Sequence, residues 1–250
     1  MNAAMAIVSA TLRQIVDRKR LLLLGALTLS PGLIYYLSTD NLPTASSMLD
    51  LFLEATIFHF SFTVPITALI LSAAALGAER RDQTLSFVVL RPIGRLTIAS
   101  AKLGSAFLAA VALNVLGALM LSAAYGARSG DWSYTAALLA GSAIATVVYT
   151  AVFVPLGYLS ERSTLIGLAY AFIWENGIVG AIGVLGVTSP WRIGYSAFAA
   201  LAPSEIQRRV QDFALADLTL SVGTAVVQAA AFAAASAALL TWILNKRDLI

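Results

Sequence analysis

The chain has 250 residues, of which 59% are hydrophobic and only 12% are charged, and its mean hydropathy is +0.84. Soluble domains carry charge on about a quarter of their residues, so this composition excludes a soluble globular domain. Uncharged runs of about 18 or more residues can cross the hydrocarbon core of a bilayer as helices. The sequence contains no cysteine, which excludes disulfides and thiolate metal sites.

Residues 1–20 precede the first long apolar run. Apolar residues recur there at helical spacing, and polar or basic residues fall on the other side. We expect an interfacial helix from about Ala3 to Arg20 on the cytoplasmic membrane surface. The alternative is a basic flank that only ends the first span.

Six apolar runs predict an all-α, polytopic membrane protein with six spanning helices. The predicted spans, with approximate bounds, are Leu21–Ser38, Ala55–Gly77, Leu103–Tyr125, Ala136–Leu159, Ser163–Val187 and Thr219–Leu244. The whole chain is then a single transmembrane domain. An even number of spans places both termini on the same side of the membrane.

The basic residues indicate which side this is. Twelve Lys and Arg residues lie in the segments that share a side with the termini, and four lie in the other segments. Cytoplasmic segments carry the excess of positive charge, so we expect both termini in the cytoplasm. The Lys and Arg residues are distributed according to membrane side and are not gathered into one basic patch, which argues against a nucleic-acid partner. Thirteen arginines against three lysines, with abundant alanine, indicate a bacterium of high genomic GC content and hence its cytoplasmic (inner) membrane.

The external segment over residues 188–218 is too long for a structureless loop. Ser189 with Pro190, and Ser204 with Glu205, predict the starts of two short helices. Apolar residues follow each start at three- and four-residue spacing, which suits a partly inserted or membrane-surface hairpin. An ordinary external cap is the alternative.

Catalytic motifs are missing from the sequence. A P-loop needs a lysine directly after a glycine, whereas Lys19, Lys102 and Lys246 follow Arg, Ala and Asn. The single histidine, His59, excludes the His-Glu-x-x-His zinc motif, and its only obvious serine neighbour is Ser61. We expect no catalytic residue, no bound metal and no ATPase site, and we interpret His59 as a packing residue.

The charged connection between the second and third predicted spans, residues 78–102, is the most informative stretch. Glu79 and Arg80 open it, and an apolar stripe at three- and four-residue spacing follows. A turn is expected at residues 92–94, which are Pro, Ile and Gly. The pattern predicts a short amphipathic helix that docks into a groove on a soluble partner. A membrane-surface helix with snorkelling arginines is the alternative.

This connection resembles the loop between the second and third helices in membrane subunits of ABC exporters of the ABC-2 type. The six-helix permeases of the nitrous-oxide-reductase copper maturation group are especially similar. The matching residues are Glu79, Thr84, Leu85, Arg91, Pro92, Ile93, Arg95 and Lys102. Gln83 stands where the family usually has glycine. The resemblance extends to the interfacial helix, the six spans and the external segment.

The resemblance implies a permease that works with partners. Separate cytoplasmic ABC ATPase subunits would hold ATP and Mg²⁺, so this chain would bind no cofactor itself. Two permease chains in the lipid bilayer would form the pathway for export, with a homodimer favoured over a heterodimer. The connection would act as the coupling helix. The residues expected to shape the ATPase contact are Glu79, Arg80, Thr84, Leu85, Arg91, Pro92 and Arg95.

Glu175 and Asn176 are polar residues inside the fifth predicted span. A carboxylate there costs about 2.5 to 3.5 kcal/mol on insertion scales, so it should face the bundle interior, a partner chain or water. Three uses are open: contact with cargo, hydrogen bonding between helices, or a proton-linked site. The alternative function is therefore a self-sufficient secondary transporter or channel that uses Glu175. A third possible function of the chain is that of a membrane-embedded assembly or anchoring subunit without transport.

Overall fold

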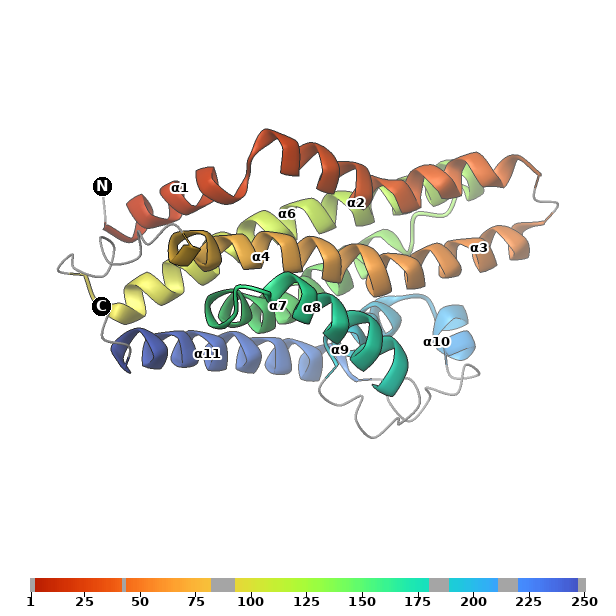
Figure 1. The fold of residues 1–250 in the computed structure, drawn as a ribbon. Coiled ribbons are helices and arrows are strands. Elements are labelled where there is room, and N and C mark those ends of the chain that lie inside the picture. Colours follow the sequence, from red (N-terminus) through yellow and green to blue (C-terminus); the bar gives the residue numbers. More distant parts are fainter. Residues whose placement is uncertain (1–2, 42–43, 82–92, 180–188, 211–219, 247–250) are drawn as a thin grey trace.

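The computed structural model describes residues 3–41, 44–81, 93–179, 189–210 and 220–246. Within these ranges the chain is helical, with short turns and no strand. The long helices lie side by side in one elongated bundle (Figure 1). The predicted all-α fold is confirmed.

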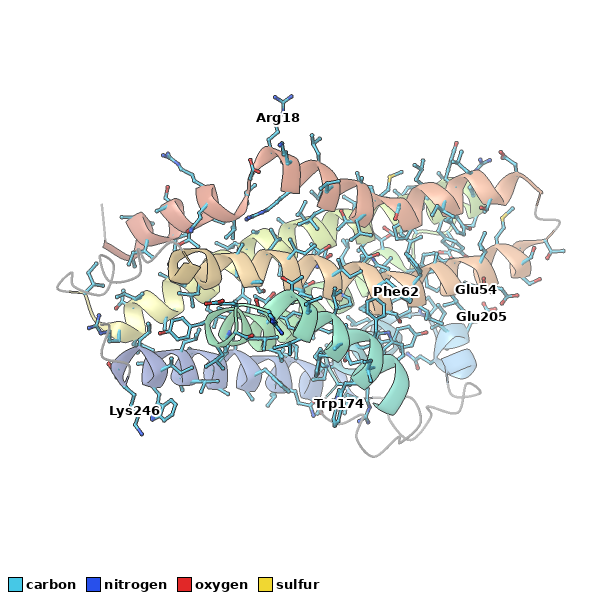
Figure 2. All side chains as sticks on the ribbon, viewed as in Figure 1. Arg18, Glu54, Phe62, Trp174, Glu205 and Lys246 are labelled. Carbon is cyan, nitrogen blue, oxygen red and sulfur yellow. The ribbon has the colours of Figure 1, made fainter. Side chains whose placement is uncertain are left out.

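The first two helices divide the chain differently from the prediction. α1 (Ala3–Ile15) is separated from α2 (Arg18–Ser38), so the predicted helix from Ala3 to Arg20 is too long. The break occurs because Asp17 adopts an extended backbone, with φ −82° and ψ 149°, and so cannot continue the helical hydrogen bonds. Residues 18–20 therefore open the first long apolar helix, and Arg18 points away from the bundle (Figure 2).

The second predicted span begins earlier than Ala55. α3 (Ala45–Phe58), η2 (His59–Thr63) and α4 (Val64–Arg81) run as one continuous helix. The start is set by a capping box: the Thr44 hydroxyl accepts a hydrogen bond from the Ser47 N–H at 3.2 Å, and the Ser47 hydroxyl accepts one from the Thr44 N–H at 3.3 Å. η2 is a single π-helical segment in the middle of this helix.

α6 (Arg95–Ser129) extends beyond the third predicted span at both ends. Residues 95–102, predicted as part of the cytoplasmic connection, form its first turns, because no proline or glycine interrupts the chain between Gly94 and Lys102. The helix stops at Gly130, whose φ of 77° suits glycine as a C-terminal cap. α7 (Thr135–Leu159) closely matches the fourth predicted span.

The last part of the chain contains both short and long helices. α8 (Ser163–Ala169) and η3 (Tyr170–Val179) form one helix over the described part of the fifth predicted span. The rest of that span lies outside the described residues. α9 (Pro190–Leu201) and α10 (Ser204–Val210) follow, and α11 (Val222–Lys246) is the final long helix.

Five helical stretches within the described ranges are long and apolar enough to cross a membrane. They are Arg18–Ser38, Ala45–Gly77, Arg95–Ser129, Thr135–Leu159 and Val222–Lys246. The described part of the fifth predicted span is too short to count among them, since it comprises a 7-residue α-helix and a 10-residue π-helix. The protein is therefore an integral, multi-pass membrane protein.

Burial distinguishes central helices from peripheral ones. The most apolar window of Ala45–Gly77 is 83% buried, and that of α7 is 67% buried. The corresponding windows of α2 and α11 are only 28% and 22% buried. α2 and α11 expose leucine, isoleucine and valine side chains, which suits a lipid environment, whereas α4 and α7 form the centre of the bundle.

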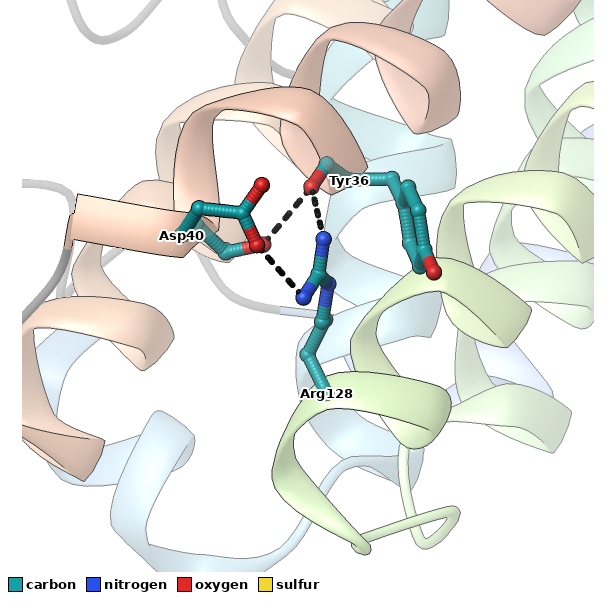
Figure 3. A network of polar contacts seen from close by, with 4 residues as sticks. Tyr36, Asp40 and Arg128 are labelled. Carbon is teal, nitrogen blue, oxygen red and sulfur yellow. Dashed lines mark hydrogen bonds and ion pairs between the residues drawn. The ribbon is translucent and has the colours of Figure 1, made fainter.

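The two ends of the bundle differ. α1 begins and α11 ends at one end, which we call the terminal end; α4 ends and α6 begins there too (Figure 1). At the opposite end, α2 is joined to α6 by Arg128, which forms an ion pair with Asp40 at 2.7 Å and donates to the Tyr36 carbonyl at 3.0 Å (Figure 3). Its guanidinium also lies 4.0 Å from the centre of the Tyr36 ring.

Candidate functional site

The expected ATPase contact is described only at its two flanks. Glu79 and Arg80 lie in the last turn of α4, and Arg95 opens α6. Four of the residues expected at this contact lie outside the described residues: Thr84, Leu85, Arg91 and Pro92. The end of α4 and the start of α6 both lie at the terminal end of the bundle (Figure 1). The flanks of the connection are thus together at one end of the molecule.

Lys102 does not belong to an exposed connection, although its position was predicted there. It lies within α6 and is only 2% exposed. The neighbouring residues Ile98 and Ala99 are fully buried as well. The exposed part of the connection is therefore shorter than residues 78–102, because α6 already packs into the bundle at this point.

Glu175 lies inside the bundle, with 7% of its surface exposed. Its carboxyl group accepts three hydrogen bonds from other elements. Tyr149 on α7 donates its phenol to Oε2. Ser189 donates its hydroxyl to Oε1 at 2.7 Å, and the Trp191 backbone N–H donates to the same oxygen at 3.1 Å. One side chain of η3 thus joins α7 and the start of α9.

Ser189 connects Glu175 to the backbone of α9. Its hydroxyl oxygen accepts a hydrogen bond from the Arg192 N–H at 3.2 Å, which confirms the predicted cap, while its proton goes to Glu175. The carboxyl group also binds the N–H of Trp191 directly. A carboxylate at this position is stabilised by the positive end of the helix dipole. Glu175 therefore extends the cap of α9 from another helix.

α9 is enclosed by the bundle. Only Trp191, Ala200 and Leu201 of its residues are not buried. It packs along α7, where a Cβ placed on Gly141 would lie 2.8 Å from the carbonyl oxygen of Gly194. A membrane-surface hairpin would leave one side of the helix open, so that interpretation does not describe α9. The burial of α9 fits a cap packed on the bundle better, and the external location of residues 188–218 stays a prediction.

Aromatic contacts fix α9 to η2. The Tyr195 ring lies edge-on to Phe60, with centroids 5.8 Å apart and planes at 89°, and it stacks on Trp191 at 4.9 Å. Burial raises the pKa of Tyr195 to about 12, so this phenol stays neutral at physiological pH. α9 is therefore held by both polar and aromatic contacts, which sequence periodicity alone does not indicate.

The remaining predicted residues are placed as follows. Asn176 follows Glu175 in η3, and its side chain lies outside the described residues. Trp174, on the other side of Glu175, points away from the bundle (Figure 2). His59 hydrogen-bonds through Nε2 to Ser142 Oγ at 3.1 Å, so its serine partner is not the adjacent Ser61. Within the described ranges, no group of three or more His, Asp and Glu residues could hold a metal ion.

Sequence reasoning found Glu175 and Ser189 but did not connect them. It missed Tyr149 because a tyrosine in an apolar helix carries no signal of its own. Contacts between elements far apart in the chain, such as the one from Tyr149 to Glu175, depend on how α7 and η3 pack. The sequence offered one indication that Glu175 has such partners: a carboxyl group buried in a bundle is costly unless hydrogen-bond donors lie nearby.

Comparison with known proteins identifies the family. No curated protein matches the chain. A family model described as "ABC-2 family transporter protein" matches residues 17–180, which include the connection between α4 and α6 as well as Glu175. This match covers more than half of the 250 residues, and the chain therefore belongs to the ABC-2 family of transporter proteins.

Proposed function

We propose that this chain is half of an export permease, driven by separate ATPase subunits that bind the connection between α4 and α6. Membership of the ABC-2 family makes the chain the membrane subunit of an ABC transporter and implies association with an ATPase subunit. The direction of transport, the pairing of two permease chains and the bacterial inner membrane are parts of the proposal. The similar six-helix permeases suggest a homodimer.

One observation carries this proposal: the family match includes the charged connection, whose flanking residues lie together at the terminal end of the bundle (Figure 1). A coupling element must reach out of the membrane on the side of the nucleotide. The excess of Lys and Arg on this side supports a cytoplasmic location. ATP and Mg²⁺ would bind to the partner, since the three lysines of this chain cannot form a P-loop.

Glu175 has a structural role in this proposal. Its two oxygens are occupied by three donors from Tyr149, Ser189 and Trp191. A secondary transporter that uses Glu175 would need this carboxyl group to exchange a cargo or a proton. The hydrogen bonds favour the use as a contact between helices, and therefore the ATP-driven mechanism over the secondary transporter.

The proposal is tested by copurification of the chain with cytoplasmic ABC ATPase subunits from the same genome. Tagged permease is purified in mild detergent with a nonhydrolysable ATP analogue, and bound ATPase is quantified. We expect the unchanged chain to retain the ATPase and Glu79→Lys to lose it. Glu205→Lys makes the same charge change on an exposed residue at the opposite end of the bundle (Figure 2), and it should retain the ATPase.

Transport provides the second readout. Glu79→Lys and Arg91→Glu should uncouple ATP hydrolysis from transport while the permease stays in the membrane. Direction follows from assays in inside-out vesicles, where an exporter accumulates its cargo in the lumen. If Glu79→Lys binds the ATPase and transports as the unchanged chain does, the connection is not the coupling element.

A further inference from the structure

Two rows of polar side chains run through the centre of the bundle. His59, Thr63 and Thr67 recur every four residues along η2 and α4. Ser142, Thr146 and Thr150 recur every four residues along α7. Asn114 of α6 joins them. We call these seven residues the polar seam, and each of them is 0% exposed.

Hydrogen bonds connect the seam across three helices. His59 Nε2 pairs with Ser142 Oγ at 3.1 Å. One turn further along α7, Thr146 donates its hydroxyl to the Ser142 carbonyl at 2.6 Å and accepts from the Asn114 amide at 3.1 Å. The same amide approaches the Val64 carbonyl at 3.5 Å. Hydrogen bonds thus link four members of the seam, which are His59, Ser142, Thr146 and Asn114. The three remaining threonines share the same helices and are equally buried.

Several atoms of the seam have no protein partner among the described residues. They are His59 Nδ1, Thr63 Oγ1, Thr67 Oγ1, Asn114 Oδ1 and Thr150 Oγ1. Each buried polar group without a hydrogen bond costs about 1–3 kcal/mol. Proteins usually avoid this cost by holding ordered water, which makes two to four hydrogen bonds with such groups. Five such atoms on three adjoining helices need more than one water molecule to satisfy them.

The chemistry of the seam suits water. Its members are hydroxyls, one amide and one imidazole, all of which can both donate and accept hydrogen bonds. No carboxylate, lysine or arginine belongs to it, so it offers no fixed charge to an ion. The layer also includes η2, and π-helical segments within α-helices are frequent at functional sites.

Close backbone contacts lie beyond the seam in both directions along the bundle. Beyond Thr67 and Thr150, a Cβ on Gly77 would lie 2.9 Å from the carbonyl oxygen of Gly157, so α4 and α7 touch there. At the other end, α9 covers Gly141, the neighbour of Ser142. The polar seam therefore lies between two glycine contacts, in the part of the bundle where α4, α6 and α7 meet.

We propose that the polar seam is a hydrated site within a single chain, occupied by ordered water that hydrogen-bonds its unpaired atoms. The inference goes beyond the proposed function, because it concerns the interior of one permease chain and not the pathway that two chains would form. Apolar packing alone would leave the same five atoms unsatisfied.

Radiolytic footprinting tests this proposal, with water itself as the probe. X-ray radiolysis produces hydroxyl radicals from bound water, and these oxidise side chains nearby. The natural chain has no cysteine, so a single introduced cysteine reports one position. Thr146→Cys and Thr150→Cys report the seam. Val148→Cys is the matched control: Val148 lies on the same helix, is also 0% exposed, and belongs to an apolar cluster with Ile193 and Ala197.

The full-length variants are compared in lipid nanodiscs, after gel filtration shows that each elutes as the unchanged protein does. Because oxidation of cysteine follows its access to water-derived oxidants, we expect the two seam positions to be oxidised roughly tenfold faster than the control. Asn114→Leu, combined with Thr150→Cys, should lower the rate at Thr150 by removing polar atoms from the layer. Equal oxidation of the seam and the control would overturn the proposal. Since no ATPase is present, that outcome would leave the coupling mechanism untouched.

Discussion

The phenol of Tyr149 on α7 donates a hydrogen bond to the carboxyl group of Glu175 on η3. The same carboxyl group holds Ser189 and the N–H of Trp191 at the start of α9. Three segments that are distant in the chain therefore meet at one acidic side chain. A carboxyl group inside a bundle is stabilised when all its neighbours donate, and here all three do.

Substitutions of Glu175 should separate the need for an acceptor from the need for a charge. Glu175→Gln retains a carbonyl oxygen for Ser189 and Trp191, so the permease should remain folded and lose about 1–2 kcal/mol of stability. Glu175→Leu leaves the three donors without an acceptor and should cost several times more. Thermal unfolding in detergent, followed by tryptophan fluorescence, measures the difference.

Tyr149→Phe is the control for this series, because it removes one donor and leaves the carboxyl group in place. The stability of Tyr149→Phe should be similar to that of Glu175→Gln and much higher than that of Glu175→Leu. A transport assay on the same variants decides the role of the charge. If Glu175→Gln assembles normally but does not transport, the carboxyl group has a use beyond helix contact.

Glycine at position 157 should be required for the packing of α4 against α7. A Cβ there would lie 2.9 Å from the Cα of Ala73, so Gly157→Ala should destabilise the bundle by about 1–3 kcal/mol, as overpacked cores do. Gly104→Ala is the matched control within α6, since nothing lies within 4 Å of its Cβ position. It should be neutral or stabilising, by up to about 1 kcal/mol, because alanine favours a helix. Equal melting temperatures for the two variants would contradict the close contact.

The contacts of Arg128 should contribute unequally to stability. Asp40 is 62% exposed, and pairs of exposed ions contribute only about 0–1 kcal/mol. Arg128→Ala also removes the hydrogen bond to the Tyr36 carbonyl and the contact with its ring (Figure 3). We therefore expect Arg128→Ala to lower the melting temperature clearly more than Asp40→Asn does. Raising the salt concentration should reduce only the part that depends on Asp40.

Single cysteines should reveal the orientation in the membrane. Lys246→Cys lies at the end of α11, at the terminal end, and Ser133→Cys lies in the exposed turn before α7. With both termini in the cytoplasm, a membrane-impermeant maleimide should label Ser133→Cys in intact spheroplasts and Lys246→Cys only after permeabilisation. The reverse pattern would show that the excess of basic residues was assigned to the wrong side.

Helix boundaries were predictable where the signal is local. α7 coincides with its apolar run, and the cap at Ser189 follows from the Ser-Pro pair. The start of α3 at Ala45 was missed because Asp50 and Glu54 interrupt the apolar run, although the capping box at Thr44 supports the helix. Hydropathy marks the part of a helix inside the bilayer, whereas capping and backbone geometry decide where the helix itself begins.

Composition and the order of apolar runs determined that this protein is an all-helical, multi-pass membrane protein, because hydrocarbon accepts only segments that satisfy their own backbone hydrogen bonds. The motif in the connection between α4 and α6 indicated the ABC-2 family, because a motif of neighbouring residues can be recognised without the tertiary structure. Tertiary structure alone decided that Tyr149 and Ser189 hold Glu175, and that His59 and Ser142 share a buried polar layer. These residues meet through the packing of helices whose faces are similar in composition, so no pattern within one segment specifies which partner each will contact.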